Sequence, residues 1–333
     1  MDSVHPISTA QVPAQFLQTA MLTGVVPLKA LRSDPRVSYC LYVPSEHYNP
    51  DPSRSSISEG EASRPSYKLP KIPLVISIHG TGRDATTCCQ RLVQFADTER
   101  CAILAPLFPA GLDDELDLDS YKLLRSKTLK SDLALLDILA EVKQRYPGIY
   151  TERFFLAGFS GGGQFVHRFL YVHPETIIAA SVGAPGRVTR LDKAWKWPQG
   201  IANVSEIFQK ELRATGGDVS LDSLRKIREI QMVVGGDDIE IPSDEFSQWV
   251  KMMKAKKSRD GGGEGSSSLE PMRTTRVDTL RNLYQEWSSL GLSTTFQVVK
   301  EVKHDSGGIH PTVEAFLTLR LRDWWLSREC PHE

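Results

Sequence analysis

Gly158-Phe159-Ser160-Gly161-Gly162 is the stretch of sequence that decides the fold. It follows the apolar run Phe154 to Ala157 and precedes a helical stretch from Gly163 to Tyr171, so the order is strand, tight turn, helix. A G-x-S-x-G nucleophile elbow requires this context. Small neighbours are needed because a bulkier side chain would collide with the adjoining strand or helix. The motif predicts Ser160 as a nucleophile, held in a strained turn with its hydroxyl at the tip.

Short apolar runs alternate with helical patterns along the rest of the chain. Several runs are unbroken, as expected for strands of a parallel sheet that is covered on both faces. The clearest helix has Leu129, Leu133, Leu136 and Leu139 on one face, and Tyr146-Pro147-Gly148 stops it. The alternation predicts an α/β fold, a doubly wound and mostly parallel sheet with helices on both faces. The expected strands are Ser38 to Val43, Leu74 to Ile78, Ala102 to Ala105, Arg153 to Ala157, Ile177 to Val182, Ile230 to Val234 and Thr295 to Val299.

Two segments depart from this pattern within what we expect to be a single domain over residues 1–333. Residues 185–224 lie between two strands and carry Trp195 and Trp197. They predict either a small cap insertion over the site or a helical excursion remote from it. Residues 255–270 are rich in glycine, serine and charge, a composition with too little apolar surface to order itself. They are expected to form a mobile loop.

Composition limits the partners and the compartment. With 40 basic and 41 acidic side chains, the net charge of −1 gives no electrostatic case for nucleic acid or an anionic membrane. Polar residues, Gly24 and Pro27 interrupt the apolar residues between Phe16 and Leu31, so no membrane span is expected there. The start lacks the basic region of a signal peptide. Five cysteines without metal spacing favour reduced thiols and a cytoplasmic protein.

A serine nucleophile needs a carboxylate and a histidine, which follow the serine in that order in this kind of sheet. The acid should come just after a strand, and Met232 to Val234 lead through two glycines into Asp237-Asp238. We predict Asp238, because a G-x-x-D spacing lets the loop turn before the carboxylate points back. Asp237 is the alternative.

The histidine should follow the last strand. His304 comes within a few residues of Val299 and precedes Gly307-Gly308 and a C-terminal helix expected to begin near Pro311. We therefore predict His304 as the base. His310 is the nearest rival, but it lies further along, next to the expected start of the helix.

Two backbone amides should stabilise the oxyanion. The strand that ends at Ile78 runs directly into His79-Gly80-Thr81-Gly82, a glycine-rich turn that can present its N–H groups to a tetrahedral intermediate. We assign one donor to Thr81, with Gly80 as the alternative, and the other to Gly161, directly after the nucleophile. His79 is expected to support this loop.

Together these residues resemble the α/β-hydrolase superfamily over roughly Ser38 to Leu326, and the finer pattern is similar to fungal esterases and polyhydroxybutyrate-depolymerase-like hydrolases. Similar members are often found in secondary-metabolite pathways, where they hydrolyse or transfer an acyl group. Unlike secreted depolymerases, this chain is expected to have no signal peptide, no disulfide framework and no separate polymer-binding domain, so an extracellular polymer substrate is not expected. The matching stretches are His79 to Gly82, Ala157 to Gly162, Gly183 to Gly186, Val233 to Gly235 with Asp238, and His304.

The resemblance implies serine, acid and base roles for Ser160, Asp238 and His304. The expected activity is hydrolysis of a small-molecule carboxylic ester or thioester through an acyl-enzyme, with no metal or organic cofactor. One alternative uses the same residues as an acyltransferase or a product-releasing thioesterase. The other is a catalytically silent member that binds a small ligand. The sequence indicates neither the substrate's identity nor the oligomeric state.

Overall fold

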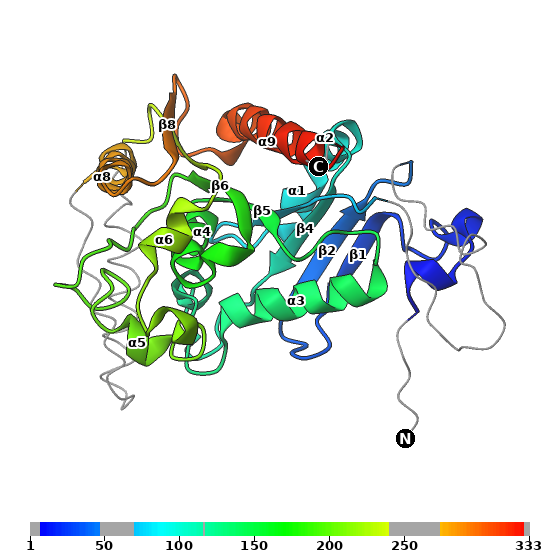
Figure 1. The fold of residues 1–333 in the computed structure, drawn as a ribbon, viewed down its shortest axis with the longest axis horizontal. Coiled ribbons are helices and arrows are strands. Elements are labelled where there is room, and N and C mark those ends of the chain that lie inside the picture. Colours follow the sequence, from blue (N-terminus) through cyan, green and yellow to red (C-terminus); the bar gives the residue numbers. More distant parts are fainter. Residues whose placement is uncertain (1–6, 47–69, 116, 240–273, 330–333) are drawn as a thin grey trace.

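A mixed sheet of eight strands organises the molecule. The structure, a computed structural model, describes residues 7–46, 70–115, 117–239 and 274–329. The strand order is β1-β2-β4-β3-β5-β6-β7-β8, and helices cover both faces of the sheet (Figure 1). The strands are β1 (Gly24–Ala30), β2 (Ser38–Val43), β3 (Leu74–Ile78), β4 (Ala102–Leu107), β5 (Phe154–Phe159), β6 (Ile177–Gly183), β7 (Ile230–Gly235) and β8 (Thr294–Val299).

The sheet is parallel from β4 through β3, β5, β6 and β7 to β8, whereas β2 pairs antiparallel with both β1 and β4. Every strand expected from the apolar runs is present, which confirms the mostly parallel α/β sheet. The strand β1 was not predicted. It is an edge strand in which only Val26 is buried, and it contains Pro27, which edge positions tolerate.

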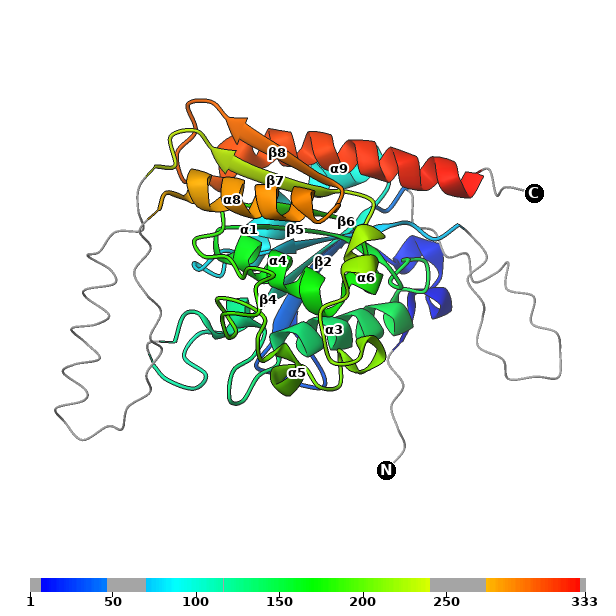
Figure 2. The same cartoon turned by 60° about the vertical axis from the view of Figure 1, so that its left-hand side comes forward.

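Helices from different parts of the chain form the two covering layers. The helices α3 and α4 pack on one face, and α1, α2 and α9 pack on the other (Figure 1). At the far edge, α8 and α9 lie on opposite sides of β7 and β8 (Figure 2). The α-helices are α1 (Ala85–Gln90), α2 (Val93–Glu99), α3 (Ser131–Arg145), α4 (Gly161–Val172), α5 (Val204–Ile207), α6 (Leu221–Arg225), α8 (Arg276–Ser289) and α9 (Ser306–Glu329).

Two hydrophobic clusters fill the space between the sheet and these layers. Side chains alternate across a strand, so Leu74 and Ile76 of β3 enter the cluster beneath α3 and α4, while Val75 enters the cluster beneath α1, α2 and α9. Burial on both faces explains why the central strands are unbroken apolar runs. It also makes this part of the sheet a rigid base for the loops at its carboxyl edge.

The buried face of α3 differs from the predicted one. Ala134, Ile138 and Val142 are buried at intervals of one helical turn, whereas Leu133 and Leu136 are only half-buried. The predicted face was based only on the positions of the leucine residues. In the structure, smaller and β-branched side chains provide part of the surface that packs on the sheet, so the face is rotated from the leucine stripe.

The C-terminal helix also begins earlier than predicted, at Ser306 instead of near Pro311. The carboxylate of Asp305 accepts hydrogen bonds from the amides of Gly307 and Gly308, at 2.9 and 3.0 Å. This cap satisfies amides that a helix start leaves without an intrahelical partner. The proline lies inside the helix. The capped start also fixes the backbone directly after His304.

The two segments set apart by composition have different outcomes. Residues 185–224 include α5 and the beginning of α6, and they lie beside α3 and α4 (Figure 1). Trp197 is half-buried and its indole donates to the carbonyl of Leu123 at 3.0 Å, while Trp195 is 56 % exposed. A capping role for this segment stays a prediction. Residues 255–270 lie outside the described residues.

The strand order places two loops side by side. After β3 the chain continues to β4 on one side of it, but β5 pairs with β3 on the other side. Such a reversal opens a crevice at the carboxyl ends of the strands, where ligands of doubly wound sheets bind. Ile78 at the end of β3 is in register with Gly158 of β5. The loop after Ile78 therefore lies next to the turn that carries Ser160.

Candidate active site

Ser160 lies at a strained turn between β5 and α4. Its backbone has φ 56° and ψ −112°, a conformation that costs a non-glycine residue on the order of 1–3 kcal/mol. The amide of Ser160 donates to the carbonyl of Gly183 at 2.8 Å, which ties the turn to β6. A Cβ on Gly158 would lie 2.6 Å from the carbonyl carbon of Gly162, so strand and helix meet with no room for a side chain. This is the geometry that the G-x-S-x-G motif predicts.

The structure brings the three predicted side chains together from three loops. The Oγ of Ser160 lies 2.9 Å from Nε2 of His304, and Nδ1 of His304 lies 2.6 Å from Oδ2 of Asp238. These residues follow β5, β7 and β8, all at the carboxyl edge of the sheet. A hydroxyl, an imidazole and a carboxylate in this series can remove a proton from the hydroxyl and stabilise the imidazolium that forms.

The alternatives named from the sequence lie elsewhere. The side chain of Asp237 is exposed, and its amide donates to the carbonyl of Val302 at 2.9 Å. That hydrogen bond ties the loop after β7 to the loop that carries His304. The Nδ1 of His310 lies 3.6 Å from Oε1 of Glu314, one turn along α9.

Arg276, which the sequence did not indicate, holds the second oxygen of Asp238. Its guanidinium lies 2.8 Å from Oδ1, and the Asp238 side chain is fully buried. Burial alone would raise the pKa of Asp238, but the hydrogen bond from His304 and the charges of His304 and Arg276 outweigh it and lower the pKa. Asp238 is therefore ionised at neutral pH. Arg276 begins α8, 38 residues along the chain, so no local pattern connects it with Asp238.

The backbone of Thr81 approaches that of Gly161, the residue after Ser160. A Cβ on Gly161 would lie 3.0 Å from the amide nitrogen of Thr81, so the two predicted oxyanion donors are close neighbours. The same Cβ would lie 2.5 Å from the hydroxyl of Tyr121, which explains why the position after the serine is glycine. The alternative residue, Gly80, uses its carbonyl to accept hydrogen bonds from the His79 ring and the Arg83 amide.

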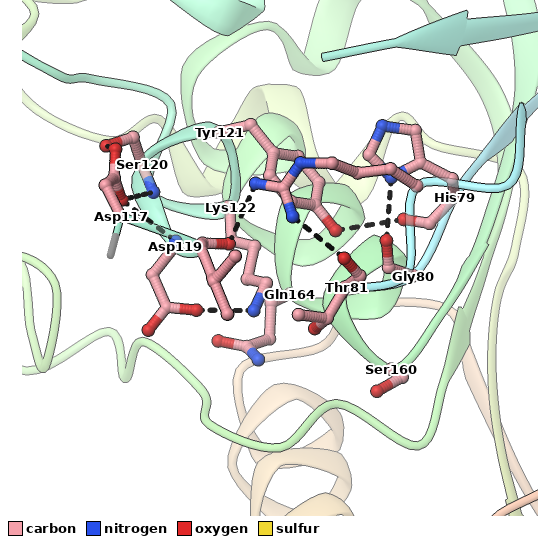
Figure 3. Close-up of polar contacts among 12 residues, drawn as sticks. His79, Gly80, Thr81, Asp117, Asp119, Ser120, Tyr121, Lys122, Ser160 and Gln164 are labelled. Atoms are coloured by element: carbon pink, nitrogen blue, oxygen red, sulfur yellow. Dashed lines mark hydrogen bonds and ion pairs between the residues drawn. The ribbon is translucent and has the colours of Figure 1, made fainter. Parts of the chain in front are cut away.

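Three side chains fix the loop that carries Thr81 (Figure 3). The ring of His79 donates from Nδ1 to the Gly80 carbonyl at 2.7 Å and accepts at Nε2 from the amide of Phe108 at 3.1 Å. Burial lowers the pKa of His79 to about 4, so the ring is neutral and suited to this double role. The hydroxyl of Tyr121 donates to the His79 carbonyl at 3.1 Å.

The third side chain is Arg83, whose guanidinium donates hydrogen bonds to backbone carbonyls. It donates to Thr81 at 2.8 Å, to Phe108 at 3.1 Å and to Leu118 at 3.1 Å. The bond to the Thr81 carbonyl restrains the Thr81–Gly82 peptide. The peptide that carries the Thr81 N–H is held through the Gly80 carbonyl, which accepts from the His79 ring and the Arg83 amide. Arg83 therefore connects the loop after β3 to the loops that precede Tyr121. Neither Arg83 nor Tyr121 was indicated by the sequence motif.

No protein-family model matches the sequence, and no curated protein matches it. Solved structures do match along most of the chain. A poly(3-hydroxybutyrate) depolymerase from Bordetella parapertussis has a TM-score of 0.58 and 19 % identity, covering 92 % of this chain and 93 % of its own. The poly(aspartic acid) hydrolase-1 of Sphingomonas sp. KT-1 has a TM-score of 0.55 and 16 % identity, with 84 % and 92 % covered. An S-formylglutathione hydrolase from Agrobacterium tumefaciens has a TM-score of 0.51 and 14 % identity, with 90 % and 99 % covered.

This chain has the α/β-hydrolase fold. At such identities the similarity shows the fold alone, and the chemistry of a fold depends on the residues of its site. Among the described residues of this α/β-hydrolase fold, no group of three or more His, Cys, Asp or Glu side chains could hold a metal ion. Within the same ranges, no helix combines the length and the apolar character needed to cross a membrane.

Proposed function

We propose that the protein is a serine hydrolase that cleaves a small-molecule carboxylic ester or thioester through an acyl-enzyme on Ser160. The observation that carries this proposal is the continuous series of hydrogen bonds from Ser160 through His304 to Asp238, at 2.9 and 2.6 Å. The resemblance to secondary-metabolite hydrolases suggests an acylated natural product as the substrate.

The first half of the reaction forms the acyl-enzyme. The Ser160 hydroxyl attacks the substrate carbonyl as Nε2 of His304 removes its proton. Asp238 accepts from Nδ1 of His304, keeps the ring in the required tautomer and stabilises the imidazolium. The amides of Thr81 and Gly161 donate to the oxyanion, and such donors are each worth about 3 kcal/mol in the transition state. The tetrahedral intermediate collapses as His304 returns the proton to the leaving alcohol or thiol.

The second half releases the acyl group. Water takes the place of the leaving group, and His304 removes one of its protons as the water oxygen attacks the acyl carbonyl. The same two amides stabilise the second oxyanion. Collapse breaks the bond to Ser160, and His304 returns the proton to the serine. The products are a carboxylic acid and the free alcohol or thiol.

The proposal is tested with a panel of 4-nitrophenyl esters and acyl thioesters of increasing chain length. Wild type should hydrolyse at least one member. Ser160→Ala should lose about 10⁶-fold in kcat, which is typical for loss of the nucleophile in such a triad. Retention of a tenth of the wild-type activity in Ser160→Ala would contradict the proposal. Formation of a new ester or amide when an alcohol or amine acceptor is added would identify an acyltransferase.

A further inference from the structure

A buried lysine stands in the wall of the candidate oxyanion hole. Lys122 belongs to the 3₁₀ helix η4 (Ser120–Leu123), and its side chain is only 5 % exposed. Its Cε would lie 2.8 Å from a Cβ on Gly161, so the aliphatic chain packs directly against one predicted oxyanion donor. Figure 3 shows the ammonium group beside the carboxylate of Asp119 and the side chain of Gln164, in the first turn of the helix after Ser160.

Stability alone does not explain a lysine in this place. Taking an ammonium group out of water costs several kcal/mol, and well-packed apolar residues often stabilise a fold as well as a buried ion pair does. The pair here is also asymmetric. Lys122 is buried, but the side chain of its partner Asp119 is 46 % exposed. Asp119 can therefore turn into solvent, whereas Lys122 cannot.

Positive charge exceeds negative charge around this pair. Arg83 and Arg168 both lie close enough to oppose the charge of Lys122. The hydrogen bonds that hold them go to uncharged groups: Arg83 donates to backbone carbonyls, and Arg168 donates to the Lys122 carbonyl at 2.8 Å and to the hydroxyl of Thr189 at 2.8 Å. Asp119 attracts Arg168 as well as Lys122, so one carboxylate faces several cations. A second anion would therefore be attracted to this part of the site.

The two carboxylates near Lys122, those of Asp117 and Asp119, make different contacts. Asp117 accepts from the amides of Asp119 and Ser120, both at 3.0 Å, so it is engaged in shaping its own turn. Among the carboxylates of the described residues, Asp119 is the one that contacts the ammonium group. Burial would raise the pKa of Asp119, but the charges of Lys122 and Arg187 keep it low. The residue that Lys122 contacts is thus an ionised carboxylate on a partly exposed side chain. A substrate carboxylate has the same chemistry and can take its place.

We propose that Lys122 is a specificity-determining residue that selects substrates bearing a carboxylate near the scissile ester, which displaces Asp119 and pairs with the ammonium group. This inference rests on the proposed hydrolase function. It assigns the substrate class that this site favours, a carboxylated ester or thioester over its uncharged counterpart.

Matched substrate pairs test the proposal on either side of the ester. The acyl-side pair is 4-nitrophenyl hydrogen adipate and its methyl ester. The alcohol-side pair is 4-carboxyphenyl butyrate and its methyl ester. The quantity measured is the ratio of kcat/KM, anionic over neutral, within each pair. Because hydrogen bonds to charged groups are the stronger class, we expect this ratio to fall about tenfold or more in Lys122→Met for the side that reaches Lys122.

Two further variants separate specificity from folding. Lys122→Arg keeps the positive charge and should retain most of the anionic preference. Asp119→Asn removes the competing carboxylate and should raise the ratio above that of wild type, and it tests the proposal even if Lys122→Met does not fold. Cleavage of both pairs with ratios unchanged in Lys122→Met and Asp119→Asn would overturn this inference alone. Failure to cleave any ester, with no covalent labelling of Ser160, would instead overturn the proposed function.

Discussion

Replacing Arg276 with glutamine should expose how much the site depends on a residue outside the motif. Arg276 contacts Oδ1 of Asp238, on the opposite oxygen from His304. The Arg276 side chain is 11 % exposed and that of Asp238 is fully buried, so the pair is largely shielded from water. Removing one partner of a buried ion pair costs about 3–5 kcal/mol. Asp238 keeps its hydrogen bond to His304, so we expect a loss near the low end, about 3 kcal/mol in the free energy of unfolding.

The pH dependence of this loss follows from the lowered pKa of Asp238. A carboxyl whose pKa is lower in the folded state contributes stability that is fully present above its unfolded pKa, about 3.9, and is lost as the pH falls through the folded value. Arg276 is one cause of the lowered pKa. The difference in the free energy of unfolding between wild type and Arg276→Gln should therefore be largest at neutral pH and become smaller below about pH 4.

Urea unfolding at pH 7, with ester hydrolysis measured in parallel, is the assay. Arg281→Gln is the matched control, because Arg281 lies on the same helix and pairs with Asp278 at 2.9 Å, but the two side chains are 45 % and 51 % exposed. Exposed ion pairs contribute little to stability. The free energy of unfolding of Arg281→Gln should therefore stay within about 0.5 kcal/mol of the wild-type value. The reasoning is refuted if Arg276→Gln is as stable as the control. A large stability loss with unchanged kcat would assign Arg276 to the fold and not to Asp238's role in turnover.

Three other substitutions probe the elbow and the acid. Asp238→Asn should lower kcat by about 10⁴-fold, whereas Asp237→Asn, at an exposed side chain, should be mild; reversed results in the ester assay would move the acid to Asp237. Ser160→Gly should be inactive, yet its free energy of unfolding in urea should exceed that of Ser160→Ala by about 1 kcal/mol, because glycine adopts φ 56° without steric cost. Equal stabilities of the two variants would mean that the turn stores no strain. Gly158→Ala should yield little folded protein by circular dichroism, since the added methyl group would lie 2.6 Å from the Gly162 carbonyl carbon, and a cooperative wild-type melt would contradict that close approach.

The central sheet could be predicted because burial on both faces requires continuous apolar strands. The same sheet allowed three parts of the site to be predicted: the elbow, the glycines after Val234 and the position of His304. In this fold the serine, the acid and the histidine each follow a strand, in a fixed order along the chain. The edge strand β1 could not be predicted, because one buried side chain and a proline leave no alternating pattern. The start of α9 was missed because its cap is a single aspartate, Asp305, next to the candidate base.

The residues that support the site could not be predicted from the sequence, for a different reason. Arg276 contacts Asp238, 38 residues away, and Arg83 donates to backbone carbonyls. Lys122 packs against Gly161, which belongs to a distant segment of the chain. An arginine that donates to carbonyls leaves no complementary residue for a motif to include. Such residues become visible only when the loops are placed together.

Covalent labelling of Ser160 tests the central claim most directly. The protein is incubated with a fluorophosphonate, its intact mass is recorded, and the modified peptide is sequenced by tandem mass spectrometry, with Ser160→Ala and Asp237→Asn treated in parallel. The account predicts one adduct per chain on Ser160 in wild type and in Asp237→Asn, and none in Ser160→Ala. An unmodified Ser160 in folded wild-type protein, or equal labelling of Ser160→Ala at another residue, would contradict it.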